Sequence, residues 1–319
     1  MRYQPPTFKS LKDMAAIDVA RLTEDEARER LEAIRWPDSP RCAHCGNENV
    51  TRLNGDSEKT RDGVLQCNHC RKQFTVTVGT VMEGSHITLR QWIQAFHMMC
   101  SSKKGVSALQ LQRNLGLGSY RSAWHLAHRI RWAMKQEPLA SALAGIVEVD
   151  ETYIGGKATD GTTGRGSSKK AAVVALIERE GRSRVKPVAR VNADTLKGAI
   201  RENVDRPATI MTDEFPSYRG IGKEFKGGHK TVNHGRKQYA RGRGNQIHVN
   251  SGESFFALLK RGVHGTFHSV SKKHLSRYCD EFSFRWDWRK VSDGERTVEA
   301  IKGASGKRLS FHSVNWNVQ

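Results

Sequence analysis

Two Cys-x-x-Cys pairs constrain the fold of this chain more than any other feature. Cys42 and Cys45 form the first pair, and Cys67 and Cys70 form the second. Each pair offers two thiolates from one tight turn, and Zn²⁺ prefers four such ligands at tetrahedral angles. The spacing therefore predicts a zinc ribbon over residues 41–85, with a redox dithiol as the alternative. The metal would supply much of its folding free energy.

The charge of the chain indicates a polyanionic partner. Its 319 residues include 53 Lys and Arg against 33 Asp and Glu, a formal net charge of +20. Nucleic acid is the default partner for such a surplus. No apolar run in the sequence approaches the roughly 18 residues of a membrane-spanning helix, and the N-terminus has no apolar signal core. We therefore expect a cytoplasmic, nucleoid-associated protein that binds DNA and no membrane. In that compartment Cys100 and Cys279 are expected to be buried thiols.

The spacing of apolar residues divides the chain into five parts. Residues 1–40 contain a helix with a capping box at Thr23, and residues 41–85 contain the cysteine pairs. Residues 86–140 have helical periodicity. Residues 145–290 favour an α/β domain with three strands, a helix capped by Asp194, two further strands and two helices. The polar residues 291–319 are expected to form a poorly ordered tail.

The helical block contains a helix-turn-helix pattern. Gly116 and Gly118 mark the turn, and Ser119 caps the second helix. The apolar stripe of that helix is Trp124, Ala127, Ile130 and Met134, and its polar positions are Arg121, His125, His128, Arg129 and Arg131. Such a helix suits a DNA groove, so we predict DNA contacts from Arg121, His125 and Arg129. A plain helical scaffold is the alternative.

Three carboxylates stand at the ends of apolar runs. Asp150 lies in the strand-like run GIVEVDETYI, Asp213 follows ATIMT, and Glu253 opens the helical run SFFALLKRG. One aspartate after a strand is commonly a cap or turn residue. Three carboxylates in this setting suit two divalent cations about 3.5–4 Å apart, which stabilise the attacking and leaving oxygens of a phosphoryl transfer. The trio therefore predicts a metal-dependent site for DNA cleavage and joining.

Other side chains near the trio are weaker candidates for metal ligands. Strand alternation places Glu148 on the face of Asp150 and Glu151 on the opposite face. We expect Glu148, Glu151 and Glu214 to support the site or to be exposed. Asn250 precedes Glu253 by three residues, so it is either an N-cap or an additional or substitute ligand.

A cationic tract lies between Asp213 and Glu253. Its basic residues are Arg219, Lys223, Lys226, Lys230, Arg236, Lys237, Arg241 and Arg243, and Glu224 is the only acid between Arg219 and Arg243. Such a loop can follow a phosphate backbone without reading bases. We predict DNA contacts from Lys237, Arg241 and Arg243, continued on the next helix by Lys260 and Arg261. A solvated charged loop is the alternative.

Extended segments of the chain are similar to motifs of one known family. CAHCG and CNHCRKQFTVTVGTVMEGS resemble its zinc ribbon, VEVDETYIGGK its first acidic motif, and MTDEFPSY its second. The stretch from HVNSGESFFALLKRG to FRWDWR resembles its long third motif. On these motifs the chain resembles the DDE transposases of the IS1595 family, in particular the ISXO2-like group.

This resemblance implies a fold, an activity and a set of partners. The fold is an RNase H-like core, a mixed sheet flanked by helices, preceded by the zinc ribbon and the helical block. The activity is Mg²⁺-dependent (or Mn²⁺-dependent) cleavage of element ends and transfer of their 3′-OH groups into target DNA. Asp150, Asp213 and Glu253 are then the catalytic acids, and Asn250 remains an alternative third group because family members differ there. The ribbon and helical block would recognise terminal inverted repeats, and joining two ends implies a homodimer or higher oligomer.

The sequence thus favours an insertion-sequence transposase that uses two metal ions. One alternative is a catalytically inactive zinc-ribbon and helix-turn-helix regulator, which would bind DNA without metal-dependent nicking. The other is an RNase H-like nuclease or resolvase, which would prefer branched or hybrid substrates over linear element ends.

Overall fold

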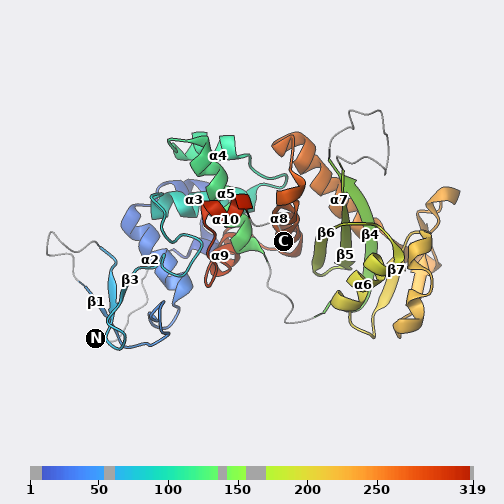
Figure 1. Ribbon diagram of the computed structural model, residues 1–319, viewed down its shortest axis with the longest axis horizontal. Helices are drawn as coiled ribbons and strands as arrows, with labels where there is room; N and C mark the ends of the chain where they lie inside the picture. The colour runs from blue at the N-terminus through green and yellow to red at the C-terminus, as the bar shows by residue number, and fades with distance from the viewer. Residues whose placement is uncertain (1–8, 54–61, 136–141, 156–169, 317–319) are drawn as a thin grey trace. The chain divides into compact units, whose positions relative to one another are not determined.

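The computed structural model describes residues 9–53, 62–135, 142–155 and 170–316 (Figure 1). The chain divides into two compact units. Unit 1 comprises Met1–Lys135 together with Lys290–Gln319, and unit 2 comprises Gln136–Arg289. The two units are described separately below.

Unit 1 begins with short helices and a small sheet. The helical elements are η1 (Leu11–Asp13), α1 (Ala16–Ala20) and α2 (Glu24–Arg35). The Thr23 side chain accepts from the backbone of Glu26 at the start of α2, which confirms the predicted capping box. The strands β1 (Val50–Arg52), β2 (Leu65–Cys67) and β3 (Gln73–Phe74) form an antiparallel sheet in the order β1-β2-β3. The zinc-ribbon segment is therefore a short β-ribbon.

The helical part of unit 1 surrounds α3 (Leu89–Ser101), whose Trp92, Phe96 and Met99 are fully buried. The other helices are α4 (Ala108–Leu115), α5 (Tyr120–Met134), α9 (Asp293–Lys302) and α10 (Phe311–Trp316). The expectation of a poorly ordered tail is wrong for the described residues after 290. Helix α9 packs against α3, and its Ala300 and Ile301 are buried. Its few apolar residues lie on one helical face, a pattern that a generally polar composition obscures.

Helices α4 and α5 have the local features of the predicted helix-turn-helix. Gly116 ends α4 in the left-handed conformation at φ 63°, which glycine adopts without a Cβ clash. The Ser119 side chain caps α5 by accepting from the backbone of Ser122. Of the predicted apolar stripe, Ala127, Ile130 and Met134 are buried, whereas Trp124 is only half-buried.

Unit 2 is built on a five-stranded mixed sheet. Its strands are β4 (Ile146–Ile154), β5 (Ala171–Glu178), β6 (Ser183–Val188), β7 (Thr209–Thr212) and β8 (His229–Thr231). The spatial order is β6-β5-β4-β7-β8. Strand β5 runs antiparallel to both β4 and β6, while β4, β7 and β8 are parallel. This order and these directions are those of an RNase H-like sheet, so the predicted fold class is confirmed.

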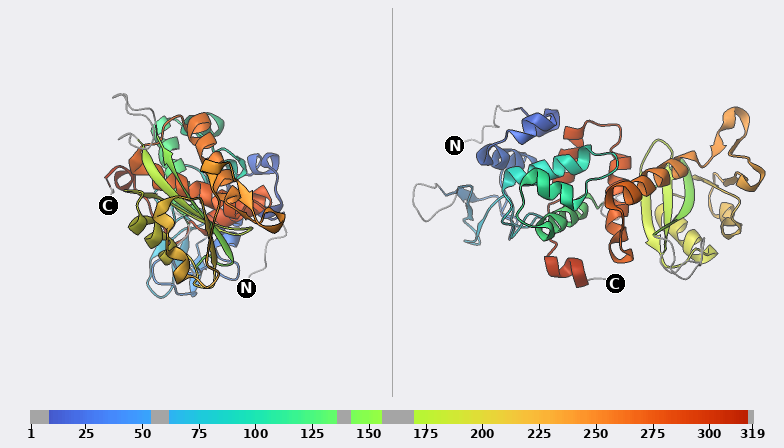
Figure 2. Two further views of the ribbon diagram at one scale, coloured as in Figure 1. Left: turned by 90° about the vertical axis from the view of Figure 1, so that its right-hand side faces the viewer. Right: turned by 90° about the horizontal axis from the view of Figure 1, so that it is seen from above.

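Helices cover both faces of this sheet (Figure 2). Helix α6 (Ala193–Asn203) packs on one face, where Leu196, Ala199 and Ile200 meet the inward residues Val147 and Val149 of β4. Helices α7 (Asn250–Gly262) and α8 (Leu275–Asp287) pack on the other, with Phe255, Leu259 and Phe282 against β5. Glu148 and Asp150 pair in register with Ile177 and Ala175 of that second cluster, so both acids lie on the face covered by α7.

Two predicted helix caps are displaced in the structure. Asn192, not Asp194, is the N-cap of α6, because its side chain accepts from the backbone of Thr195. Val249, not Asn250, is the N-cap of α7 and provides no side-chain hydrogen bond. Asn250 is the first residue of α7 and is exposed.

The segment between β8 and α7 is irregular. It contains η5 (His234–Arg236), β9 (Ala240–Arg241), η6 (Arg243–Asn245) and β10 (Ile247–His248), with β9 and β10 paired antiparallel. The short helices η3 (Pro216–Tyr218) and η4 (Ile221–Glu224) precede β8, and η7 (Val263–Phe267) and η8 (Lys272–His274) follow α7. In the described part of the chain, no helix is long and apolar enough to cross a membrane.

Candidate active site

The four cysteine thiols of the ribbon form one cluster. The Sγ atoms of Cys42 and Cys70 are 3.6 Å apart, as are those of Cys45 and Cys67, and all four lie within 4.8 Å of one another. Zn–S bonds of about 2.3 Å at tetrahedral angles place neighbouring sulfurs about 3.8 Å apart. The cluster therefore fits a tetrahedral Zn²⁺ ion. Cys100 and Cys279 are buried thiols, as expected.

Two of the predicted catalytic acids stand on adjacent parallel strands. Strands β4 and β7 pair with Glu148 opposite Met211, and the same register places Asp150 beside Asp213, directly after β7. Each carboxylate also accepts a local backbone hydrogen bond. The N–H of Glu151 donates to Asp150 at 2.8 Å, and that of Phe215 donates to Asp213 at 3.0 Å. Parallel pairing thus brings together two acids that are 63 positions apart in the chain.

The third acid, Glu253, lies in the first turn of α7, which approaches Asp150 closely. A Cβ atom added at Gly252 would lie 3.2 Å from the Asp150 Cβ, so a larger residue there would push the helix away. Glu253 is exposed, and its Oε1 is 3.7 Å from Nδ1 of His234. The three acids therefore come from β4, the end of β7 and the start of α7.

These carboxylates interact electrostatically but do not form a closed cage. Burial raises the pKa of Asp150 to about 7, and the charges of Glu151, Asp213 and Glu253 add to the shift. Among the described residues, only the cysteines form a group of three or more His, Cys, Asp or Glu side chains with ligand atoms all within 4.8 Å. The donors are nevertheless the hard oxygens that Mg²⁺ and Mn²⁺ prefer, so they fit such an ion in kind.

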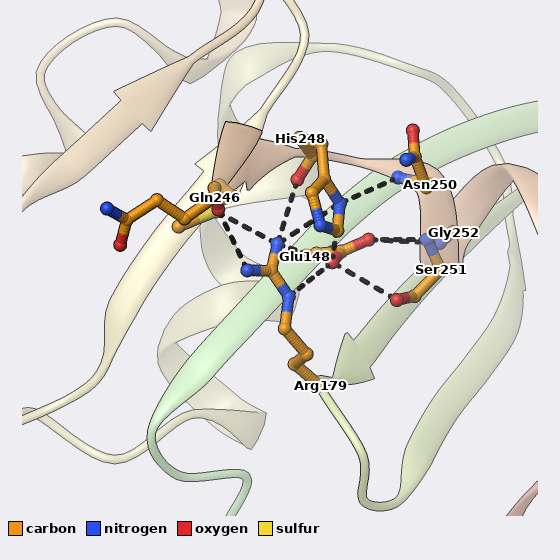
Figure 3. A network of polar contacts seen from close by, with 8 residues as sticks. Glu148, Arg179, Gln246, His248, Asn250, Ser251 and Gly252 are labelled. Carbon is orange, nitrogen blue, oxygen red and sulfur yellow. Dashed lines mark hydrogen bonds and ion pairs between the residues drawn. The ribbon is translucent and has the colours of Figure 1, made fainter. Parts of the chain in front are cut away.

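Glu148 is the most connected carboxylate near the trio (Figure 3). It is fully buried, and its Oε1 accepts from Nε and Nη2 of Arg179 at 2.9 and 2.8 Å. Its Oε2 accepts from the backbone N–H groups of Ser251 at 2.7 Å and Gly252 at 3.3 Å. Those amides belong to the first turn of α7, where Val249 offers no capping oxygen. Glu148 therefore caps α7 from a neighbouring strand.

Arg179 and Glu148 were difficult to assign from the sequence. The sequence placed Glu148 on the correct face and left open whether it supports the site. Arg179 follows β5 and carries no motif, so nothing in the sequence marked it. Only the sheet brings the β5–β6 turn next to β4.

Glu151 and Glu214 also have defined partners. The Tyr218 hydroxyl donates to Glu151 Oε2 at 2.7 Å, on the face of β4 that α6 covers. Burial raises the pKa of Tyr218 well above its usual value, so this hydroxyl remains a donor. Glu214, next to Asp213, accepts from the backbone of His234 and Gly235, both at 2.9 Å. The backbone N–H groups of Gly235, of Glu214 itself and of His234 lower the pKa of the Glu214 carboxyl.

The predicted DNA contacts of unit 2 lie at the surface. Lys237, Arg241, Arg243, Lys260 and Arg261 are all exposed. Arg241 donates through Nε to the carbonyl of Thr231, and Arg261 donates to that of Ala257. Their charges therefore remain accessible to a polyanion.

The predicted DNA contacts of unit 1 divide into exposed and buried groups. Arg121 is exposed, with its guanidinium 3.9 Å from the centre of the Phe311 ring. His125 is half-buried, with Nε2 3.1 Å from the Leu309 carbonyl. Arg129 is only 5% exposed, donates to the carbonyl of Glu83 and lies over the Trp92 ring, so its prediction as a DNA contact is wrong for this structure.

His128 and Arg131, also expected on the polar surface of α5, are buried as well. Helix α5 is surrounded on more sides than its polarity suggested. It contacts α3, α4, α9 and α10.

Comparison with known proteins gives two family matches. Residues 142–287 match an ISXO2-like transposase domain, and residues 22–73 match a transposase zinc-ribbon domain. The chain is 26% identical over 279 residues to an uncharacterized protein in transposable element ISH50 of Halobacterium salinarum, covering 83% of this chain and 91% of that protein. A crystal structure of a pre-cleavage Mos1 transpososome is similar over 64% of this chain and 75% of that chain, at 15% identity and a TM-score of 0.26.

Proposed function

Because this chain belongs to the IS1595 family of transposases, in its ISXO2-like group, we propose that it cleaves the ends of its insertion sequence and joins them to target DNA. Asp150, Asp213 and Glu253 are the catalytic carboxylates in this proposal. The observation that carries it is the convergence of β4, β7 and the first turn of α7 on Asp150, whose pKa rises to about 7.

The three carboxylates would hold divalent metal, Mg²⁺ or Mn²⁺. When bound, such ions stabilise the attacking and leaving oxygens of an in-line phosphoryl transfer. Asp150 must lose its proton to act as a ligand, and its raised pKa places that loss near neutral pH. Glu253 approaches from α7, a different element from the strands, so the site depends on how α7 is held.

The chain's own cations would bind the DNA. The exposed residues Lys237, Arg241 and Arg243 follow Asp213 in sequence, and Lys260 and Arg261 follow Glu253 on α7. Contacts of this kind hold the phosphate backbone without reading bases. Recognition of the terminal inverted repeats would fall to the ribbon, with a structural Zn²⁺ on Cys42, Cys45, Cys67 and Cys70, and to α5 through Arg121 and His125. Joining two ends requires two sites, so we propose at least a homodimer on DNA.

The test is a strand-transfer assay with labelled DNA ends taken from the sequence that flanks the gene. The wild type is expected to nick and transfer these ends only with Mg²⁺ or Mn²⁺. Asp150→Asn, Asp213→Asn and Glu253→Gln should each reduce transfer to background while DNA binding persists. Glu202→Gln is the matched control, because Glu202 forms an exposed ion pair between α6 and Lys186 of β6.

Several outcomes would contradict the proposal. If Asp150→Asn transfers DNA ends as well as the wild type, Asp150 is not a catalytic carboxylate and the proposed active site is wrong. DNA binding by the wild type without metal-dependent nicking would indicate a regulator, and preference for branched or hybrid substrates would indicate a nuclease or resolvase. An inactive Asn250→Ala variant together with an active Glu253→Gln variant would make Asn250 the third group instead.

A further inference from the structure

The segment between β8 and α7 is strongly cationic. Residues 233–248, here named the cationic insertion, contain no Asp or Glu and carry the exposed cations Arg236, Lys237, Arg241 and Arg243. Tyr239, at 58% exposure, is also on its surface. A one-sided cationic surface of this kind suits a phosphate backbone.

The first end of the insertion is held by Glu214. The two carboxylate oxygens of Glu214 accept from consecutive backbone N–H groups, those of His234 and Gly235, each at 2.9 Å. Glu214 directly follows Asp213 in the chain. The start of the insertion is therefore tied to the strand end that carries the second catalytic acid.

The second end of the insertion is held by Glu148 through Arg179 (Figure 3). Arg179 donates to the carbonyls of Gln246 at 2.8 Å and His248 at 3.2 Å, the last residues of the insertion. The same guanidinium is bound to Glu148, two positions before Asp150. The end of the insertion is therefore tied to the strand that carries the first catalytic acid.

Glu148 connects this anchor to the third acid as well. It accepts from the backbone of Ser251 and Gly252, in the turn of α7 that carries Glu253. An apolar contact supports the arrangement, since Ile247 packs against the small cluster of Met211, Val232 and Val249. Two sets of hydrogen bonds, one around Glu214 and one around Glu148, thus hold the ends of the insertion to the elements that carry the three catalytic positions.

The acceptor capacity of Glu148 is already used. It is fully buried, Oε1 also accepts from the Ser251 hydroxyl at 3.1 Å, and Oε2 accepts from two backbone amides. A carboxylate has about four acceptor positions, and five hydrogen bonds already occupy this one. Glu148 is therefore suited to orient its neighbours and poorly suited to bind metal.

We propose that the cationic insertion is an arm that binds the DNA backbone beside the cleaved bond, and that Glu148 and Glu214 are positioning residues that hold its two ends against the strands of Asp150 and Asp213. This inference rests on the proposed function, since it takes DNA as the substrate. As a consequence, DNA that the arm binds is positioned against the catalytic carboxylates. Loosening either anchor should then reduce catalysis while DNA binding is kept.

The first experiment measures DNA binding in an Asp150→Asn background, which removes any dependence on catalysis. Dissociation constants for the element end are measured from low to moderate salt, with and without Lys237→Gln and Arg243→Gln together. The arm variant should bind more weakly, and the slope of log affinity against log salt should fall by about 0.9 for each phosphate that the protein no longer neutralises. The matched control is Lys186→Gln with Arg201→Gln, which removes the same charge from surface ion pairs at β6 and α6.

If the arm variant and the control variant have the same slope of log affinity against log salt, the cationic insertion is not a DNA-binding arm. This result is distinguishable from failure of the proposed function, because the binding measurement does not require cleavage. Conversely, an inactive wild type whose arm variant still shows a reduced salt slope would refute the transposition chemistry and leave the arm in place.

The second experiment tests the anchors with Glu214→Gln and Arg179→Lys in the active protein. Glu214→Gln presents an amide NH₂ toward one of two backbone donors, so it should loosen the arm. We expect kcat for strand transfer to fall at least tenfold, with the Mg²⁺ concentration for half-maximal rate unchanged within twofold. Glu202→Gln should change neither quantity.

A metal ligand at position 214 would give a different result. The Mg²⁺ concentration for half-maximal rate would then rise strongly in Glu214→Gln, which would overturn the positioning role. Unchanged kcat in both Glu214→Gln and Arg179→Lys would overturn it as well. Both variants keep a polar side chain at partly exposed positions, so loss of folding is not the expected outcome, and circular dichroism checks it.

Discussion

The guanidinium of Arg179 donates two hydrogen bonds, of 2.9 and 2.8 Å, to a single oxygen of the fully buried carboxylate of Glu148. Arg179 itself is 19% exposed. A buried charge is tolerated because it is paired and because other donors satisfy its remaining lone pairs. Here those donors are the first amides of α7, so one ion pair joins the central strand of the sheet to the helix that carries Glu253.

This relationship predicts a stability effect at Arg179. Arg179→Met should lower the free energy of unfolding by about 3–5 kcal/mol, because it leaves the Glu148 charge buried without its partner. Arg179→Lys should lower the free energy of unfolding by less, since lysine keeps the positive charge but cannot reproduce both guanidinium hydrogen bonds to Glu148. Urea denaturation followed by fluorescence measures both. A loss below about 1 kcal/mol for Arg179→Met would contradict a stabilising role for this buried ion pair.

The raised pKa of Asp150 predicts a pH dependence of stability. Between its ordinary value of 3.8 and about 7, the folded state keeps a proton on Asp150 that the unfolded state has lost. The contribution of Asp150 to stability is therefore present at low pH and is lost as pH rises through about 7.

The matching variant is Asp150→Asn, which removes this titration. Without added Mg²⁺, its free energy of unfolding relative to the wild type should increase from pH 5 to pH 8, by on the order of 1–3 kcal/mol. Comparing the two proteins cancels the other carboxylates. A difference that does not change with pH would contradict the raised pKa. Added Mg²⁺ should reduce the difference, since it stabilises the ionised wild-type site.

The cysteine cluster predicts one bound Zn²⁺ per chain. Elemental analysis of the purified protein should give a stoichiometry near one. Chelation or Cys67→Ser should unfold the ribbon, because a small segment with little core obtains much of its folding free energy from the metal. Near-ultraviolet circular dichroism and limited proteolysis of residues 41–85 report this loss. Cys100→Ser is the control, since Cys100 is buried in α3 outside the cluster, and zinc loss in that variant would contradict the assignment.

The different burial of two arginines on α5 predicts different phenotypes. Arg121→Gln should weaken binding to the element end severalfold and leave the melting temperature within about 2 °C, since Arg121 is exposed. Arg129→Gln should lower the melting temperature by several degrees, because it removes a buried donor from the Glu83 carbonyl and a cation from the Trp92 ring. Thermal unfolding and a gel-shift titration of both variants provide the measurements. The reverse pattern would mean that α5 is packed differently in solution.

Local signals in the sequence predict structure well where the structural outcome depends on residues that are close together in the chain. Strand alternation places Glu148 and Asp150 on one face of β4 and Glu151 on the other, and the register confirms it. Thr23 and Ser119 cap their helices as predicted. The predicted cap of α6 is wrong by two residues, since Asn192 and Asp194 are equally good capping residues and only the backbone path separates them.

Side-chain environments are harder to predict from the sequence. The residue types of Arg129, His128 and Arg131 favour a polar surface, but other helices of unit 1 cover them. The polar composition after residue 290 favours a lack of order, but α9 packs on α3 with only a narrow apolar face. In both cases the partner is distant in the chain, so no window of sequence around the residue contains the information.

By itself, the sequence determined the metal-binding pattern of the cysteines, the order of helices and strands, and the choice of three candidate acids, because each depends on short-range spacing and residue chemistry. Only the tertiary structure decided that Arg179 and Glu148 hold α7 and that Glu214 holds the cationic insertion. These contacts join residues from 20 to 104 positions apart, and they exist only once the sheet has paired β4 with β5 and β7. The physical reason is that a buried charge takes its partners from whatever the fold places within hydrogen-bonding distance, whatever their separation along the chain.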